Sequence, residues 1–173
     1  ERAEREITEA LVRRAGTPEG GGKAFMLVMG ASGSGKSSLV RAGLPMQEAF
    51  AKIVLGLSAD ADYFATLAKL RAARAVWSRV TAACGVTAAP RIEARSSHRM
   101  LAAHDPWTNM LRLTASAVGA SIGGADAVVL GSFTDALGLP TAFARRQSRN
   151  TQLVLMEEAG VGRVADPAAG FGY

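Results

Sequence analysis

Eight consecutive residues carry the clearest chemical signal in this sequence. Residues 30–37 read Gly-Ala-Ser-Gly-Ser-Gly-Lys-Ser, which fits the pattern G-x-x-x-x-G-K-[ST] of a nucleotide-phosphate loop (P-loop). In such a loop, backbone N–H groups surround phosphate oxygens, the lysine contacts the β- and γ-phosphates, and the serine hydroxyl binds Mg²⁺. The pattern predicts a site for Mg-ATP or Mg-GTP with Ser37 as the metal ligand. The predicted nucleotide-binding residues are Gly30, Ser32, Gly33, Ser34, Gly35, Lys36, Ser37 and Ser38.

The segments around this loop fit its chemistry. Residues 24–29 are a continuous apolar run, as expected for a buried parallel strand. A helix is predicted to begin near Lys36 and to end at residues 43–45, so its N-terminal N–H groups would face the phosphates. A Gly/Ser turn that only resembles a phosphate loop is the alternative.

The remainder of the chain alternates between strand and helix patterns. Apolar residues at steps of three or four predict a long helix over 60–84 that packs one side against a core. The expected core positions of this helix are Phe64, Leu67, Leu70, Trp77, Val80 and Cys84. Strands are predicted at 53–57, 91–96 and 127–130, and further helices at 105–122 and 139–158. This alternation indicates an α/β chain with a parallel sheet or part of an α/β barrel.

Two local patterns need separate interpretation. Asp105 and Pro106 are predicted to open a helix, as its N-cap and first-turn residue. Residues 153–156 are apolar and precede Glu157 and Glu158, which is also the pattern of a strand ending in a Mg²⁺-binding acid. Because residues 141–152 lead into this run without a helix breaker, we predict helix there.

Composition narrows the class of protein. The net charge of +5 suits phosphate-bearing ligands such as nucleotides or coenzyme A. The basic residues are scattered without interleaved aromatics, so we expect no nucleic-acid partner. Cys84 is the single cysteine, and His98 and His104 lack metal-ligand spacing and are expected at the surface. No apolar run reaches about 18 residues, so we expect a cytoplasmic protein without a membrane partner.

Two resemblances meet in this chain. Residues 1–46 resemble the start of STAND-type NTPases, chiefly through residues 25–30 and the run Ser-Ser-Leu-Val-Arg-Ala-Gly at 37–43. Residues 51–173 resemble acyl-CoA mutases of the methylmalonyl-CoA mutase type. The matching blocks lie at 61–74, 105–112, 123–127, 143–153 and 163–167. The run Ala-Arg-Ser-Ser at 94–97 is similar to that of the small, non-catalytic subunits of these mutases.

The mutase resemblance implies a fold, an activity and a site. It implies part of a (β/α)₈ TIM barrel, here preceded by the strand–P-loop–helix unit, whose bore receives an acyl-CoA. The family's activity is an adenosylcobalamin-dependent isomerisation, but its cobalamin motif Asp-x-His-x-x-Gly is absent from this sequence. The implied CoA- or substrate-binding residues are Lys69, Arg71, Arg74, Arg95 and Ser97. The alternatives are a solvated basic helix face and, for Arg95, an ion pair with Glu93 or Asp126.

Three functional hypotheses follow from these patterns. The first is a mutase module of residues 51–173, non-catalytic alone, that binds a CoA thioester or pairs with a catalytic subunit or with the remainder of the barrel. The second is an ATP- or GTP-binding module centred on residues 1–46. The third is a mosaic chain, joined near residues 45–51, with no function as a unit. An incomplete barrel would also expose strand edges, which predicts aggregation or dependence on a partner.

Overall fold

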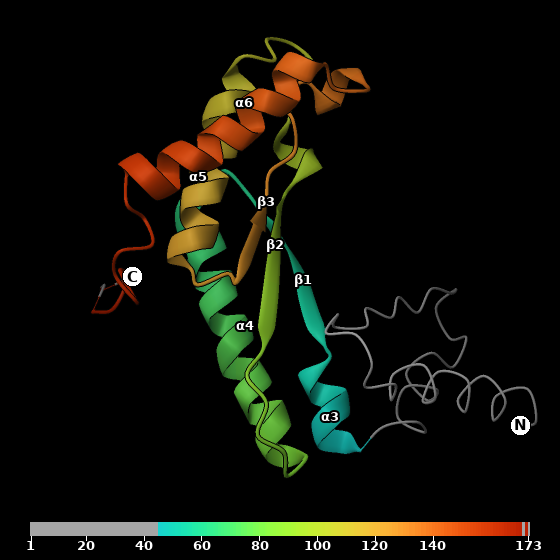
Figure 1. Cartoon of the computed structure of the whole chain (residues 1–173), viewed down its shortest axis with the longest axis vertical. Coiled ribbons are helices and arrows are strands. Elements are labelled where there is room, and N and C mark those ends of the chain that lie inside the picture. The colour runs from blue at the N-terminus through green and yellow to red at the C-terminus, as the bar shows by residue number, and fades with distance from the viewer. Residues whose placement is uncertain (1–44, 171, 173) are drawn as a thin grey trace, which may run out of the picture. The chain divides into compact units, whose positions relative to one another are not determined.

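The computed structural model describes residues 45–170 and 172. Helices, strands and short helical turns alternate along these residues (Figure 1). The main elements are α3 (Met46–Ala51), β1 (Val54–Ala59), α4 (Tyr63–Ala83), β2 (Arg91–Ser96), α5 (Thr108–Ile122), β3 (Ala127–Val129) and α6 (Ala142–Leu153). The short turns are η1 (His98–Met100), η2 (Asp135–Leu137) and the π-helical η3 (Val154–Glu158).

These residues fall into two compact units. The described part of the first unit comprises residues 45–53 and 81–88. There the side chain of Gln47 is hydrogen-bonded to the backbone of Thr87, with its amide nitrogen 2.5 Å from the carbonyl oxygen and its amide oxygen 3.0 Å from the N–H. The second unit comprises residues 54–80 and the chain from residue 89 onward, and it holds the sheet.

The sheet of the second unit consists of three parallel strands in the order β1-β2-β3. Leu57, Ala94 and Val128 are partners across the sheet, so their side chains share one face. On that face Leu70 of α4 and Ala120 of α5 join the buried core with Ala94. Figure 1 shows α4 and α5 beside the strands. The predicted α/β alternation with a parallel sheet is thus confirmed for these residues.

The buried face of α4 differs from the predicted one. Leu67, Leu70 and Trp77 are buried as expected, but Phe64 is 52% exposed and Val80 is 42% exposed. Cys84, just beyond the helix, is exposed as well. The polar residue Thr66 lies on the buried face instead. Its hydroxyl can be buried because it donates to the Asp60 carbonyl and accepts from the Asp60 N–H. A prediction from apolar residues alone omits such a satisfied threonine.

Helix starts were the least predictable feature. Helix α5 begins at Thr108 instead of Asp105, whose backbone has a φ of 50° and whose carboxylate accepts from the Thr108 hydroxyl. Helix α6 begins at Ala142, after Thr141 caps it by accepting from the Ala144 N–H at 3.2 Å. The chain stays helical through residues 154–158. The predicted helix is therefore confirmed over the alternative strand ending in a Mg²⁺-binding acid.

Candidate functional site on the open face of the sheet

The face of the sheet opposite α4 and α5 carries small and charged side chains. Strand register places Gly56, Glu93 and Ala127 in one row, and Ser58, Arg95 and Val129 in the next. All six of these residues are exposed or half-buried. Parallel sheets usually have apolar residues on both faces because both are covered. We call this surface the open face, and its composition suits a polar ligand better than a packed helix.

Two predicted basic residues lie close to one serine of the open face. Lys69 reaches from α4, and its Nζ lies 3.3 Å from the Ser58 Oγ. Arg95 is the strand partner of Ser58. Its Nε donates to a carboxylate oxygen of Glu93 at 2.6 Å, which is the ion pair considered as an alternative for Arg95. The Arg95 side chain is nevertheless 68% exposed. Ser58 was not singled out from the sequence, although its alternation with Leu57 and Ala59 was visible there.

Loops at the carboxyl ends of β2 and β3 are joined by hydrogen bonds. The Ser96 Oγ accepts from the Gly131 N–H at 2.7 Å, and an Asp135 carboxylate oxygen accepts from the Ser132 N–H at 2.8 Å. Ser97 is buried and its hydroxyl caps η1 by accepting from the Arg99 N–H at 3.3 Å. Ligand sites of α/β proteins lie at this edge. The binding role of Ser97 stays a prediction, since its contacts are local.

Asn109 connects the segments that follow β2 and β3. Its side chain is fully buried. The amide oxygen accepts from the Ala102 N–H at 3.0 Å, and the amide nitrogen donates to the Ala102 and Phe133 carbonyls at 2.8 and 2.9 Å. Sequence reasoning missed this residue, because only the topology brings residues 102 and 133 to the same helix N-terminus. Asn109 therefore fixes the carboxyl edge of the sheet.

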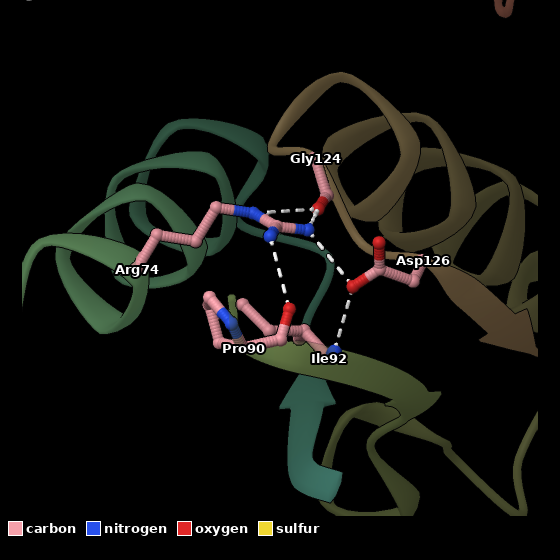
Figure 2. A network of polar contacts seen from close by, with 5 residues as sticks. All are labelled: Arg74, Pro90, Ile92, Gly124 and Asp126. Carbon is pink, nitrogen blue, oxygen red and sulfur yellow. Dashed lines mark hydrogen bonds and ion pairs between the residues drawn. The ribbon is translucent and has the colours of Figure 1, made fainter. Parts of the chain in front are cut away.

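Arg74 lies at the opposite, amino-terminal edge (Figure 2). Its guanidinium donates to the Gly124 carbonyl through both Nε and Nη2, and its Nη1 donates to the Pro90 carbonyl at 3.2 Å. Its Nη2 also lies 2.9 Å from a carboxylate oxygen of Asp126, which accepts from the Ile92 N–H at 2.7 Å as well. These contacts tie α4 to the starts of β2 and β3. The predicted CoA contact of Arg74 would compete with them.

Arg71 borders a cavity near the same edge. The cavity has a volume of about 620 Å³ and is lined by residues that include Arg71, Arg74, Gly124 and Asp166. Arg71 Nη1 donates to an Asp166 carboxylate oxygen at 2.6 Å, and this hydrogen bond lowers the pKa of Asp166. The predicted basic set is therefore divided: Lys69 and Arg95 lie beside Ser58, whereas Arg71 and Arg74 border the cavity.

Histidines and other metal ligands do not gather in the described chain. His98 and His104 are both exposed, as expected. Among residues 45–170, no group of three His, Cys, Asp or Glu side chains is placed to hold a metal ion. In the same part of the chain, every helix is too short or too polar to cross a membrane.

The predicted nucleotide site lies outside the described residues. This applies to residues 24–29, to all the predicted ligands between Gly30 and Ser38, and to the predicted Mg²⁺ ligand Ser37. Binding of Mg-ATP or Mg-GTP, like the division into segments 1–46 and 51–173, stays a prediction.

The fold and the open face together indicate the class of fold to which this chain belongs. Parallel strands joined through helices on one face fit a segment of an α/β barrel. A family model described as methylmalonyl-CoA mutase matches residues 6–173. The chain belongs to the methylmalonyl-CoA mutase family. The match runs through the phosphate-loop pattern, and the comparisons do not show the resemblance of residues 1–46 to STAND-type NTPases.

Curated relatives agree with this family. The chain is 50% identical over 133 residues to a methylmalonyl-CoA mutase small subunit of Streptomyces virginiae, covering 76% of this chain and 22% of the relative. It is 41% identical over 140 residues to the small subunit of Propionibacterium freudenreichii subsp. shermanii, covering 79% and 22%. It is 35% identical over 138 residues to a methylmalonyl-CoA mutase of Escherichia coli, covering 78% and 19%. The chain spans about a fifth of the length of these relatives.

Proposed function

We propose that this chain is a module of an acyl-CoA mutase, non-catalytic alone, that binds a CoA thioester on the open face and pairs with a catalytic mutase subunit. The observation that supports CoA binding is that Ser58, on strand β1, lies between two cationic side chains. Lys69 contacts Ser58 directly, and Arg95 is its neighbour on β2.

The chemistry of a CoA thioester matches this arrangement. Its phosphates are anionic and attract lysine and arginine, while its pantetheine amides form hydrogen bonds with hydroxyl groups. Gly56 and Ala127 leave room beside the charged row, since a Cβ added at Gly56 would meet nothing within 4 Å. A slender polar chain can therefore lie along the open face, whereas bulky apolar side chains there would exclude it.

The non-catalytic character is supported by the residues present. The family's isomerisation depends on adenosylcobalamin, and neither exposed histidine of this chain lies in the family's ligand motif. The residues of this chain therefore do not include that ligand motif. Pairing is supported by the names of the relatives from S. virginiae and P. freudenreichii, which are small subunits. We infer that this chain, too, acts beside a catalytic subunit.

Calorimetric titration with coenzyme A and methylmalonyl-CoA tests the binding site. We expect Lys69→Ala and Arg95→Ala each to weaken binding by about tenfold, which is the loss of one charge-assisted contact. Arg79→Ala, an exposed arginine elsewhere on α4, is the matched control and should bind as the wild type does.

Two results would overturn the proposal in different ways. If the wild-type chain shows neither heat nor a shift in melting temperature at millimolar ligand, the proposed CoA binding is wrong. If Arg71→Ala abolishes binding while Arg95→Ala leaves it unchanged, CoA binds at the cavity near the amino-terminal edge and the open-face site is wrong. Size-exclusion chromatography with the catalytic subunit tests pairing, and separate elution at micromolar concentrations would contradict it.

A further inference from the structure

The carboxylate of Glu93 restrains one edge of the Arg95 guanidinium on the open face. The two residues are two positions apart on β2, so their side chains leave the same face of the sheet about 6.6 Å apart along the strand. One carboxylate oxygen of Glu93 accepts from the Arg95 Nε–H at 2.6 Å. In the described part of the chain, neither side chain has another hydrogen-bond partner. The contact therefore uses Nε and leaves the two terminal amino groups of Arg95, Nη1 and Nη2, to a ligand.

The terminal edge of this guanidinium suits an oxyanion. Nη1 and Nη2 lie in one plane and donate in parallel, so together they bind two oxygens of a carboxylate or of a phosphate. The Arg95 side chain is 68% exposed, and an arginine with so few neighbours loses much rotamer freedom when a ligand orders it. The shorter Glu93 side chain is only 32% exposed. It can therefore serve as the fixed point that limits the orientations of Arg95 before a ligand arrives.

Ser58 offers a further donor beside Arg95, because the two residues are partners across β1 and β2. The Lys69 Nζ lies 3.3 Å from the Ser58 Oγ. An ammonium group only donates, so the serine oxygen accepts in this contact and its own hydroxyl hydrogen points elsewhere. A ligand oxygen on the open face can accept that hydrogen. An oxyanion at this place would therefore meet a hydroxyl and a guanidinium, each of which is held by a second side chain of the site.

We infer that Glu93 is a positioning residue of the open-face site, which holds Arg95 so that its terminal edge binds an oxyanion of the CoA thioester. This inference rests on the CoA binding of the proposed function. A phosphate of coenzyme A and the carboxylate of a methylmalonyl group both supply such an oxyanion. Glu93 affects binding in two opposite ways: its charge repels the oxyanion, but its contact lowers the entropy cost of ordering Arg95. Substitutions separate the two effects, because glutamine keeps an acceptor oxygen without the charge and alanine keeps neither.

The test titrates Glu93→Gln and Glu93→Ala of the full chain with coenzyme A and with methylmalonyl-CoA in a calorimeter. Both variants lack the charge, so the difference between them measures positioning alone. We expect Glu93→Ala to bind about fivefold more weakly than Glu93→Gln, because the ligand must then order a long side chain itself. This difference should vanish when Arg95→Ala is added to each variant. Glu158, an exposed glutamate of η3, is the matched control, and Glu158→Gln and Glu158→Ala should bind equally well.

The outcomes separate this inference from the proposed function. If the wild type binds neither ligand, the proposed CoA binding and this inference are both wrong. If the wild type binds but Glu93→Gln and Glu93→Ala bind equally well, the CoA binding stands and the positioning role is wrong. A difference that persists when residue 95 is alanine also contradicts it, because Glu93 then does not act through Arg95.

The two ligands also identify the oxyanion. A difference between Glu93→Gln and Glu93→Ala with coenzyme A assigns the oxyanion to a phosphate, whereas a difference only with methylmalonyl-CoA assigns it to the carboxylate. Melting curves accompany each variant. If Glu93→Ala fails to fold, Glu93→Met takes its place, because methionine keeps an unbranched stem and has no oxygen to accept from the Arg95 Nε–H.

Discussion

Replacing Arg74 by methionine should destabilise the second unit strongly. Methionine keeps an unbranched apolar stem but removes the guanidinium, so three partners lose a charged donor: the carbonyls of Pro90 and Gly124 and the carboxylate of Asp126. A hydrogen bond to a charged group contributes about 1.5–3 kcal/mol. The side chains of Arg74 and Asp126 are 35% and 43% exposed, so water replaces part of each contact. We therefore expect about 1 kcal/mol for each partner, and about 3 kcal/mol in total.

Urea unfolding followed by circular dichroism measures this loss. With an m-value of about 2 kcal/mol/M, a loss of 3 kcal/mol lowers the midpoint by about 1.5 M at constant slope. Arg79→Met is the matched control on the same helix, because Arg79 is exposed. Its free energy of unfolding should change by less than about 0.5 kcal/mol. If Arg74→Met unfolds at the same urea concentration as Arg79→Met, the structural role assigned to the guanidinium is refuted.

Three further changes test the carboxyl edge and the C-terminal segment. Gly131→Ala should lower the unfolding free energy by about 1–3 kcal/mol, because its Cβ would lie 2.6 Å from a carboxylate oxygen of Asp135 and would displace that oxygen from the Ser132 N–H, whereas Gly56→Ala should be tolerated. Asn109→Ala should cost about 3 kcal/mol in the same assay, since three backbone groups, one of them buried and two partly buried, lose a partner. Asp166→Asn should lower the midpoint at pH 7 but not in strong acid. The lowered pKa of Asp166 gives stability above the ordinary carboxyl range of about 4, and this stability is lost as the pH falls through the lowered value. A midpoint difference that persists unchanged into strong acid would contradict this assignment.

Local pattern was sufficient to predict the three strands and the bodies of α4, α5 and α6, whereas α3 was not predicted. The strand predicted at 91–96 is β2, residue for residue, and the long helix predicted over 60–84 is α4 with shorter ends. The helix follows from apolar residues at helical spacing, and β2 has its apolar residues at alternate positions, and both patterns depend only on neighbouring residues. Helix starts depend on backbone geometry as well. The φ of 50° at Asp105 prevents this residue from serving as the expected N-cap.

The candidate site was predictable only in part, for a topological reason. Lys69 and Arg95 were predicted from the family resemblance. The strand register places Arg95 beside Ser58, and Lys69 reaches the same serine from α4. The sequence around Arg74 does not indicate that its guanidinium N–H groups donate to the backbone carbonyls of residues 90 and 124. Those contacts exist because parallel strands place their amino ends side by side.

The two edges of the sheet have different roles in this proposal: contacts at the amino-terminal edge stabilise the fold, and residues near the carboxyl edge bind the ligand. Arg74 contacts the residue just before β2, whereas Arg95 lies near its carboxyl end. Five residues of extended strand separate these points, a distance of about 16 Å. Sites so far apart, with no shared partner, affect unfolding independently. Arg95 also forms its ion pair at the surface, where such pairs contribute little to folding. A loss of CoA binding in Arg95→Ala at an unchanged melting temperature would therefore reflect the open face itself, because the contacts that hold β2 and β3 together at their amino ends remain intact.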